Sequence, residues 1–471
     1  MKKLLYIVLP ALLVITSCKK NLTDLNVNPK SPTTVPAAGE FTGAEHTFAN
    51  ILSSASVNLN IFRLIEQQWQ ETTYTDESNY DINTRPIPDA IWNAFYRDAL
   101  ENFEQAKKLG AADPASKVNN AMVDVMEVYS YYYLTTTFGN VPYSQALNPD
   151  NLFPVYDDAL TVYKSLLTRL DADITALGSG TSSFGAADLL YGGSATQWKK
   201  AAATLKLKMA ITLSDADNAT AKAAAESAAT AGLFTSNADN MTFAYLSAPP
   251  NTNPVWVDLV QSGRQDFVAN TVLVTTLKSL NDPRLSFFFT TDANGGYSGA
   301  APGASANYSA FSKPSTTITQ QTYPGLLLSY SEMQFDLAEA VERGYNVGGT
   351  AAAHYNEGVT ASITFWGGTA AQATTYLAQP TVAYATAAGT YKQKIGIQKW
   401  ISFYNRGWDA WINQRRLDYP VLTAPATART AFPVRFTYPV QEGNVNGPNF
   451  TAAGAAIGGN TVTTKLFFDK F

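Results

Sequence analysis

The stretch Ser329–Gly344 reads SYSEMQFDLAEAVERG and carries the start, the apolar face and the end of an amphipathic helix. Ser329 followed by Glu332 three residues later is a capping box, which marks a helix start. Apolar residues then recur three or four positions apart, namely Met333, Leu337, Ala340 and Val341. Glu339 and Arg343 are spaced for an ion pair along the helix, and Gly344 ends it. The stretch therefore predicts a helix that packs by one face.

Helical periodicity of the same kind extends on both sides of this stretch. Further helices are predicted over residues 43–71, 89–109, 156–177, 271–280, 351–366 and 395–414, and two more begin at Asp113-Pro114 and at a capping box over residues 194–197. The fold class is thus mostly α. Helices of similar length joined by short turns suggest pairs stacked as in tetratricopeptide repeats, and a generic helical bundle is the alternative.

The amino-acid composition changes between about residues 236 and 324, where Pro, Gly, Asn, Ser and Tyr dominate. A segment of this length with little regular structure is usually functional or disordered, and its interleaved tyrosines favour a binding surface. No clean linker divides the chain. We therefore expect a single body over residues 37–471, in which a helical scaffold carries a loop-rich insertion at about 236–324.

The amino terminus has the three parts of a secretory signal peptide. Lys2 and Lys3 precede an apolar run over residues 4–15, which is shorter than the roughly 20 residues of a spanning helix. The run ends in Ile15-Thr16-Ser17-Cys18, which resembles the bacterial lipobox, and Cys18 is the only cysteine. We predict a signal peptide at 1–17 and a lipidated Cys18 with a flexible tether at 18–36. An ordinary signal peptide with an incidental cysteine is the alternative.

Composition excludes some classes of function. Charged residues make up only 15% of the chain and the net charge is −5, so nucleic acid is an improbable partner. What replaces charge is a mixture of Ala, Thr, Ser and Asn with 12% aromatic residues, including 25 Tyr and 8 Trp. Such a surface suits neutral, hydroxyl-rich ligands.

Catalytic chemistry is sparsely represented. The chain has two histidines, His46 and His354, which are better read as packing or surface residues, and it lacks HExxH and G-x-S-x-G motifs. Paired carboxylates keep a glycosidase open, although the pairs Asp76 with Glu77 and Asp215 with Asp217 look like caps and solvated turns. We predict no cofactor; calcium is conceivable at an Asp/Asn-rich turn, but no EF-hand spacing supports it.

Aromatic residues in the loops are the stronger signal for binding, because a sugar ring has an apolar face that stacks on Tyr or Trp. The candidate ligand-binding residues are Tyr74, Tyr80, Trp92, Arg264, Tyr297, Tyr308 and Tyr323. The alternative is that most of these aromatic side chains pack in the core. For Arg264, with Asp266 two residues later, the alternative is an ordinary ion pair.

Seven segments stand in order along the mature chain. They are TFGNVPYSQAL (137–147), LNDPRLSFFF (280–289), SYSEMQFDLAEAVERG (329–344), HYNEGVTASITFWG (354–367), KIGIQKWISFYNRGWDAWINQRRLDYP (394–420), VRFTYPVQEGNVNGPNF (434–450) and KLFFDKF (465–471). This ordered set resembles the SusD/RagB family of outer-membrane lipoproteins, in its starch-binding-associated branch.

The resemblance implies a tetratricopeptide-like scaffold with an irregular, ligand-binding part. Proteins similar to this capture oligosaccharide or other nutrient at the cell surface and deliver it to a SusC-like TonB-dependent transporter, without catalysis. It also implies attachment to the outer membrane through the lipid on Cys18. Lys19 and Lys20 stand where surface lipoproteins often have acidic residues. The sequence therefore does not decide which leaflet of the outer membrane carries the anchor. A glycoside hydrolase and a structural helix-repeat adaptor are the competing hypotheses.

Overall fold

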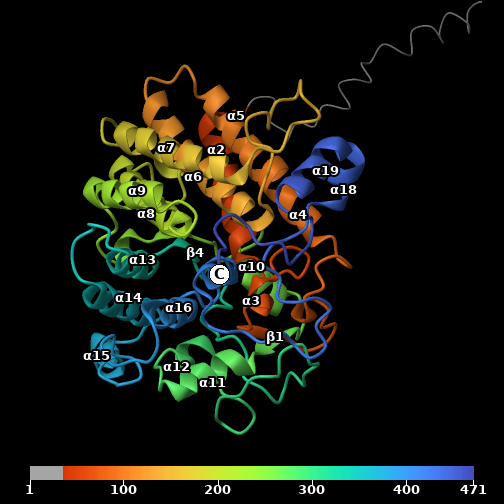
Figure 1. The fold of residues 1–471 in the computed structure, drawn as a ribbon, viewed down its shortest axis with the longest axis vertical. Coiled ribbons are helices and arrows are strands. Elements are labelled where there is room, and N and C mark those ends of the chain that lie inside the picture. The colour runs from red at the N-terminus through yellow and green to blue at the C-terminus, as the bar shows by residue number, and fades with distance from the viewer. Residues whose placement is uncertain (1–34) are drawn as a thin grey trace, which may run out of the picture. The chain divides into compact units, whose positions relative to one another are not determined.

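Helix pairs form the scaffold of this computed structural model, which describes residues 35–471 (Figure 1). The pairs are α2 (Ala37–Ser53) with α5 (Glu101–Leu109), α6 (Ser116–Phe138) with α7 (Ala159–Leu177), α8 (Ala195–Leu213) with α9 (Asn218–Ala231), and α13 (Tyr330–Glu342) with α14 (Ala351–Phe365). The predicted mostly α-helical class with a helix-pair scaffold is confirmed. The predicted signal peptide, Cys18 and nearly all of the tether lie outside the described residues.

Shorter elements fill the space between the pairs and build the loop-rich part. The shorter helices are α3 (Phe62–Ile65), α4 (Ile87–Asn93), η2 (Ala94–Leu100), α10 (Pro254–Trp256), η5 (Val257–Gln261), α11 (Thr271–Ser279), α12 (Leu285–Phe288), α15 (Ala370–Leu377), α16 (Tyr391–Ser402), α17 (Gly407–Leu417), α18 (Val440–Val445) and α19 (Gly447–Ala456). Single turns of 3₁₀ helix are η1 (Glu77–Asn79), η3 (Gly185–Ala187) and η4 (Asn237–Asp239). Both η2 and η5 are π-helical, and α4, η2 and α5 run on without a break.

Side-chain caps begin the main helices. The Asp158 carboxylate accepts from Thr161 N at 2.8 Å at the start of α7, and Ser329 Oγ accepts from Glu332 N at 3.1 Å at the start of α13. Of the two hydrogen bonds in the capping box predicted at Ser329, only the one from Glu332 N to Ser329 Oγ forms. The Glu332 carboxylate instead pairs with Lys208 and Arg406, because two buried cations bind it more strongly than one backbone N–H.

Two predicted helices are shorter than the sequence pattern suggests. The helix expected over 43–71 ends at Ser53, because the side chains of Asn60 and Arg63 fold back and donate to the last carbonyls of α2. The helix expected over 395–414 is divided into α16 and α17. Asn405, with φ of 66°, lies at the break and turns the chain.

A buried ionic cluster joins three helices. Lys208 Nζ of α8 lies 2.8 Å from Glu332 Oε1 of α13 and 2.5 Å from Asp409 Oδ1 of α17. Arg406 Nη2 contacts the other oxygens of the same carboxylates, at 2.9 and 2.6 Å. Two cations thus share two carboxylates out of water, which fixes the registration of α8 against α13 and α17.

Two short antiparallel strand pairs tie the loop-rich part to the scaffold. Strand β1 (Trp69–Glu71) pairs with β3 (Phe267–Ala269), and β2 (Met241–Phe243) pairs with β4 (Gly325–Leu328). The first pair joins a loop near the amino terminus to the insertion. Residues far apart in sequence are thereby brought to one place.

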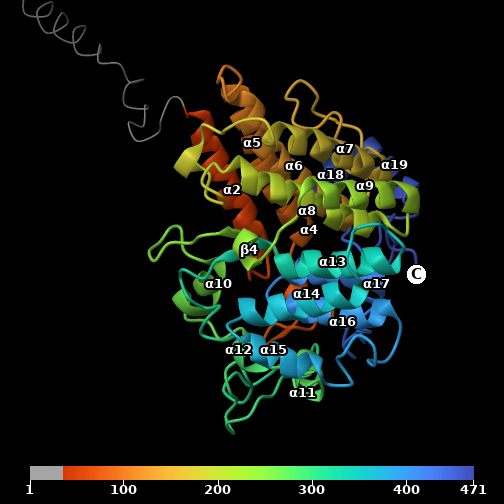
Figure 2. The same cartoon turned by 90° about the vertical axis from the view of Figure 1, so that its left-hand side faces the viewer.

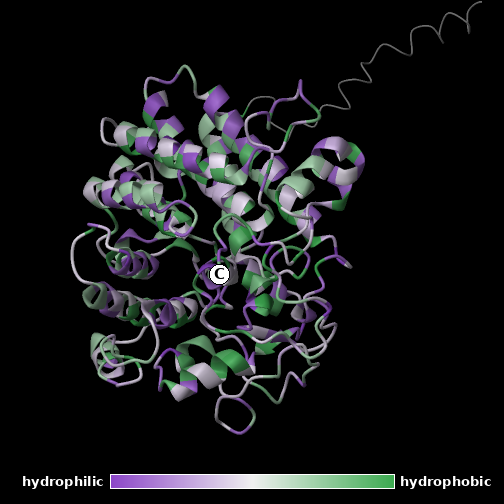
Figure 3. Cartoon of the chain, viewed as in Figure 1, coloured by the Kyte–Doolittle hydropathy of each residue, from purple (hydrophilic) through white to green (hydrophobic). Residues whose placement is uncertain are grey.

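The first helix pairs lie toward one end of the described molecule, and the α11–α12 segment of the loop-rich part lies toward the other. In Figures 1 and 2, α5 lies near one end of the long axis and α11 and α12 lie near the other. Hydrophilic and hydrophobic residues alternate along the scaffold helices (Figure 3), as helices that pack by one face require. Among the described residues, no helix has both the length and the apolar character needed to cross a membrane.

Candidate functional site

A pocket of about 350 Å³ opens where the first loop meets the insertion. It is lined by Ala55, Ser56, Val57, Asn58, Tyr74, Arg85, Asp258, Ser262, Arg264, Asp266 and Phe267. Two residues singled out from the sequence, Tyr74 and Arg264, therefore lie on the wall of one pocket. We call this the Tyr74 pocket.

Tyr74 is held in a strained and exposed position. Its φ is 53°, in the left-handed region that a bulky residue rarely adopts, and its exposed fraction is 74%. The backbone just before it is fixed, since Thr72 donates to Asp266 O at 2.8 Å and, through its hydroxyl, to Gln265 O at 2.6 Å. Strain of this kind persists where the surrounding structure enforces it, often at binding sites.

Arg264 forms the ion pair that its spacing with Asp266 suggested. Arg264 Nε lies 2.5 Å from Asp266 Oδ2, while 61% of the arginine side chain stays exposed. Ser262 Oγ accepts from Arg264 N at 3.1 Å and Gly263 takes φ of 68°, so a tight turn presents the guanidinium. The pair offers both donors and acceptors to a ligand.

Arg85 also lines the pocket and is held by a buried carboxylate. Its Nε donates to Glu77 Oε1 at 2.5 Å, and Glu77 exposes only 1% of its side chain. Burial, together with the nearby Glu77 carboxylate, raises the pKa of Glu71 to about 9, so Glu71 keeps its proton and the two acids coexist. The Arg85–Glu77 pair thus fixes one part of the pocket wall.

The rim over residues 54–58 is positioned by another arginine. Arg63 is buried against the Trp69 ring, 5.1 Å from its centroid, and donates to Ser53 O and Ser54 O at 3.1 and 2.5 Å. Sequence reasoning missed the rim residue Asn58 and the wall residue Arg85. The usable signals were the polar turn SVNLN and an arginine beside a proline, and both are common in loops.

Burial raises the pKa of Asp258, a third carboxyl of the pocket, although Arg63 and a backbone hydrogen bond from Ala55 oppose the shift. The walls thus combine an exposed aromatic ring with arginine, carboxyl and amide groups. A ring stacks on an apolar face, and the planar polar groups exchange paired hydrogen bonds with neighbouring hydroxyls. This combination suits an oligosaccharide better than a wholly apolar ligand.

Two predicted residues lie in the core. Tyr80 exposes none of its surface, and its hydroxyl accepts from Gln67 Nε2 at 3.1 Å, so no face is left for a ligand. Trp92 is 7% exposed and packs among other aromatic rings, which is the core-packing alternative stated for these aromatic residues.

Three predicted tyrosines lie in the insertion, outside the lining of the Tyr74 pocket. Tyr323 stacks on Trp366 with centroids 6.2 Å apart, and Tyr297 packs half-buried against the core. Tyr308 lies under the ammonium of Lys313, 5.2 Å from the ring centroid. Ala306 N donates to Thr72 O, so the loop of Tyr308 runs beside the strand that leads to Tyr74.

The carboxylate pairs considered from the sequence have structural partners. Asp215 pairs with Arg343 at 2.8 Å, and Asp217 caps α9 through Thr220 N at 3.1 Å. Asp76 contacts Arg429 at 3.2 Å on the surface. Within residues 35–471, no three His, Cys, Asp or Glu side chains are grouped as a metal site requires.

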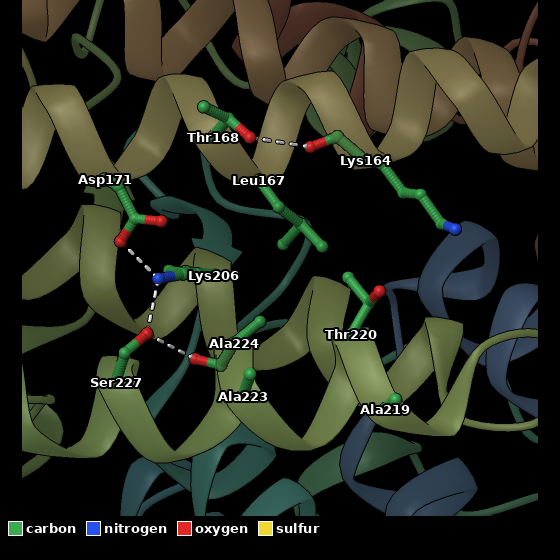
Figure 4. Close-up of a pocket in the computed structure, with 10 residues that line it drawn as sticks. All are labelled: Lys164, Leu167, Thr168, Asp171, Lys206, Ala219, Thr220, Ala223, Ala224 and Ser227. Carbon is green, nitrogen blue, oxygen red and sulfur yellow. Dashed lines mark hydrogen bonds and ion pairs between the residues drawn. The ribbon is translucent and has the colours of Figure 1, made fainter.

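A second hollow, of about 640 Å³, lies between α7 and α9 and is backed by α8 (Figure 4). Lys206 rises from α8 into it, with its Nζ on Ser227 Oγ at 2.5 Å and paired with Asp171. Lys164, at the other end, pairs with Asp217 at 2.5 Å. Its ten lining residues include no aromatic ring, so it lacks the stacking surface of the Tyr74 pocket.

Comparison with known families decides the relationship. The pattern of a SusD-like family, described as starch-binding and associating with the outer membrane, matches residues 29–439. The chain belongs to this SusD-like family. Its members are nutrient-binding proteins associated with the outer membrane. The resemblance seen in the seven ordered segments is thereby confirmed.

Solved SusD-like structures share the whole fold. A chitin-binding protein is 29% identical, with a TM-score of 0.82, and the alignment covers 92% of this chain and 100% of that one. A SusD-like protein from Bacteroides thetaiotaomicron is 24% identical, with a TM-score of 0.79 and coverage of 92% and 99%. A chitin-binding SusD homologue from Flavobacterium johnsoniae is 22% identical, with a TM-score of 0.78 and coverage of 91% and 98%. None of the curated proteins matches the chain.

Proposed function

We propose that this SusD-like protein is a non-catalytic lipoprotein that captures an oligosaccharide and delivers it to a SusC-like TonB-dependent transporter. The observation that carries the proposal is the Tyr74 pocket. It joins a 74% exposed aromatic ring to the Arg264–Asp266 pair and to the amide-bearing rim. The ring provides a surface on which a sugar stacks, and the polar groups form hydrogen bonds with its hydroxyls.

The ligand class is a neutral, hydroxyl-rich glycan. Each arginine of the pocket has a carboxylate partner, Arg264 with Asp266 and Arg85 with Glu77, so the walls carry no unbalanced positive charge that an acidic sugar would need. The family description favours a starch-like ligand, and the name of the 29% identical structure favours a chitin-like one. Both are neutral glycans.

Anchoring completes the proposal. A lipid on Cys18 attaches the protein to the outer membrane, and the tether over residues 18–36 lets the body stand at the cell surface. The helical scaffold faces the transporter, and the loop-rich part faces the ligand. The groove between α7 and α9 belongs to the scaffold side.

Isothermal titration of the mature protein tests the function. The panel contains chitooligosaccharides, maltooligosaccharides and a peptide of comparable length. We expect binding to at least one glycan series and none to the peptide. Peptide binding without glycan binding would contradict the proposed substrate class.

One observation favours the second candidate, glycoside hydrolysis. Asp258 and Asp266 both line the Tyr74 pocket, and burial raises the pKa of Asp258, as a general acid requires. Against it, Asp266 is engaged by Arg264. Incubation of the same glycans with pure protein measures the release of reducing ends. Under the binding proposal no release occurs, and release that is abolished by Asp258→Asn would establish the hydrolase.

A further inference from the structure

Exposed apolar residues lie at and next to one further pocket, away from the Tyr74 pocket. Leu152 (70% exposed) of the α6–α7 loop and Val445 (58%) of α18 line this pocket. Three more exposed apolar residues stand within two positions of lining residues in the sequence, and we call all five the apolar rim: Leu152, Phe153 (58%), Val155 (39%), Val440 (69%) and Val445. In Figure 2, α10 and α19, which follows directly on α18, lie at opposite sides of the molecule. Large apolar side chains gathered at one exposed place mark interaction sites.

The pocket inside the apolar rim has a volume of about 380 Å³. Trp92 and Tyr96 line it, and Leu147 and Pro154 add apolar surface. Trp92 is only 7% exposed, and Tyr96 and Tyr156 pack against it with ring centroids 4.8 and 5.7 Å away, so its ring offers little surface on which a sugar could stack. The apolar lining suits an inserted apolar side chain better than a sugar ring.

The apolar rim is held in place by hydrogen bonds. Asn446 Nδ2 donates to Pro154 O at 2.8 Å, and Asn449 Nδ2 donates to Phe153 O at 3.1 Å. Tyr156 adds a bond from its hydroxyl to Glu442 Oε2 at 2.6 Å. These bonds clamp the loop onto α18 and α19. The exposure of the rim is therefore built into the fold, and a partner would meet a preorganised surface.

Backbone strain marks the same place. Leu147 lines the pocket with φ of 57°, in the left-handed region that a leucine rarely adopts. Leucine has no side-chain polar atom to compensate locally, unlike asparagine. A strained backbone conformation is thus present at this pocket, as it is at Tyr74.

The charged residues at the wall of this pocket indicate which charge a partner should carry. Arg97 is neutralised by Asp98, with Nε–Oδ1 and Nη2–Oδ2 distances of 2.6 and 2.8 Å. The carboxylates of Glu101 and Glu442 add to the pocket wall without a further cation among its lining residues. A basic residue beside the inserted side chain complements this wall, whereas an anionic lipid surface is repelled by it.

We infer that the apolar rim and its pocket are the docking site for a loop of the SusC-like transporter that inserts a leucine or an aromatic side chain with a lysine or arginine beside it. This inference rests on the proposed function and names the surface that serves it. The groove between α7 and α9 is the weaker choice. None of its lining residues is among the large exposed hydrophobics of residues 35–471, and both of its lysines have carboxylate partners.

The test measures binding of the mature protein to a detergent-purified SusC-like transporter from the same organism. Leu152→Asp with Val445→Asp is the test variant, and Val421→Asp, at an exposed valine outside the rim, is the matched control. We expect the double variant to lose at least about 10-fold in affinity for the transporter, while the Val421→Asp control binds the transporter as wild type does. Glu101→Lys should also weaken binding.

The outcomes distinguish failure of the docking site from failure of the proposed transporter role. Wild-type binding that the double variant retains overturns the docking site and leaves the transporter role intact. Absence of wild-type binding overturns both. Glycan titration, light scattering for self-association and flotation with phosphatidylethanolamine vesicles are run on the same variants. In a further outcome, the double variant keeps transporter binding and loses glycan binding, self-association or vesicle binding instead. That outcome assigns the apolar rim to a different occupant and also overturns the inference.

Discussion

Tyr74 and Arg264 face one pocket because the register of β1 with β3 makes them neighbours. Glu71 pairs with Phe267, and the strands are antiparallel. Tyr74 stands three residues after Glu71, and Arg264 stands three residues before Phe267. The two loops therefore leave the strand pair on the same side, and one register fixes an aromatic ring beside a guanidinium.

A close backbone approach tests how α17 is seated. A Cβ on Gly407 would lie 2.4 Å from Arg63 N and 2.6 Å from Phe62 C. Gly407→Ala should therefore lower the free energy of unfolding by about 1–3 kcal/mol. Gly43→Ala, in the exposed middle of α2 with nothing within 4 Å, should raise it by about 0.5–1 kcal/mol. Urea denaturation measures both, and equal effects would refute the packing.

The buried cluster around Lys208 predicts a large loss of stability. Lys208→Met leaves Glu332 and Asp409 with only Arg406 to compensate them, and breaking a buried pair costs about 3–5 kcal/mol. Lys222→Met, which removes an exposed amine 3.9 Å from Glu226, should change stability by less than about 0.5 kcal/mol. A small effect of Lys208→Met in denaturant titration would show that the cluster is solvated.

Glu71 predicts a fall in stability with rising pH. Its pKa is raised from 4.5 to about 9 in the folded protein by burial, so between these values the folded state binds more protons than the unfolded state. The free energy of unfolding then decreases as pH rises through this window. Glu71→Gln removes this dependence, so the variant should gain on wild type at pH 8.5 relative to pH 5. Parallel pH profiles would exclude a neutral Glu71.

Helix starts at serine caps were predictable, because such a cap and an apolar stripe are local signals. Two other starts were predicted wrongly: the helix expected to begin at Asp113-Pro114 begins at Ser116, and the one expected from residue 43 begins at Ala37. Ser329 and Ser194 are both found as helix caps, and Glu339 pairs with Arg343 as its spacing required. Helix ends were harder to predict. Asn60 and Arg63 reach back to the last carbonyls of α2, and nothing in the local pattern shows these contacts.

The candidate site was predictable only in part, again because non-local contacts are not visible in the local sequence pattern. The exposed tyrosine and the Arg264–Asp266 pair are visible as residue types in loops, but the β1–β3 register that joins them is non-local. Tyr80 illustrates the converse, since it shares the loop with Tyr74 yet is wholly buried. Sequence alone does not say which face of a loop meets the core.

The proposed lipid on Cys18 gives a prediction about location. Cys18→Ser removes the only thiol that can carry the lipid, so the protein should move from the membrane fraction to the soluble fraction of the envelope. Intact-mass spectrometry of the wild type should show an added acyl mass on a chain that begins at Cys18. A wild-type protein without added mass would contradict the anchor.

Glycan affinity of Tyr74→Ala is the most direct test of the account. With the glycan that wild type binds, the account predicts a loss of about 10-fold or more, because stacking on the exposed ring is removed. Val421→Ala, at another exposed apolar side chain, should bind as wild type. Unchanged affinity in Tyr74→Ala, measured by isothermal titration on folded protein, would contradict glycan capture at this pocket.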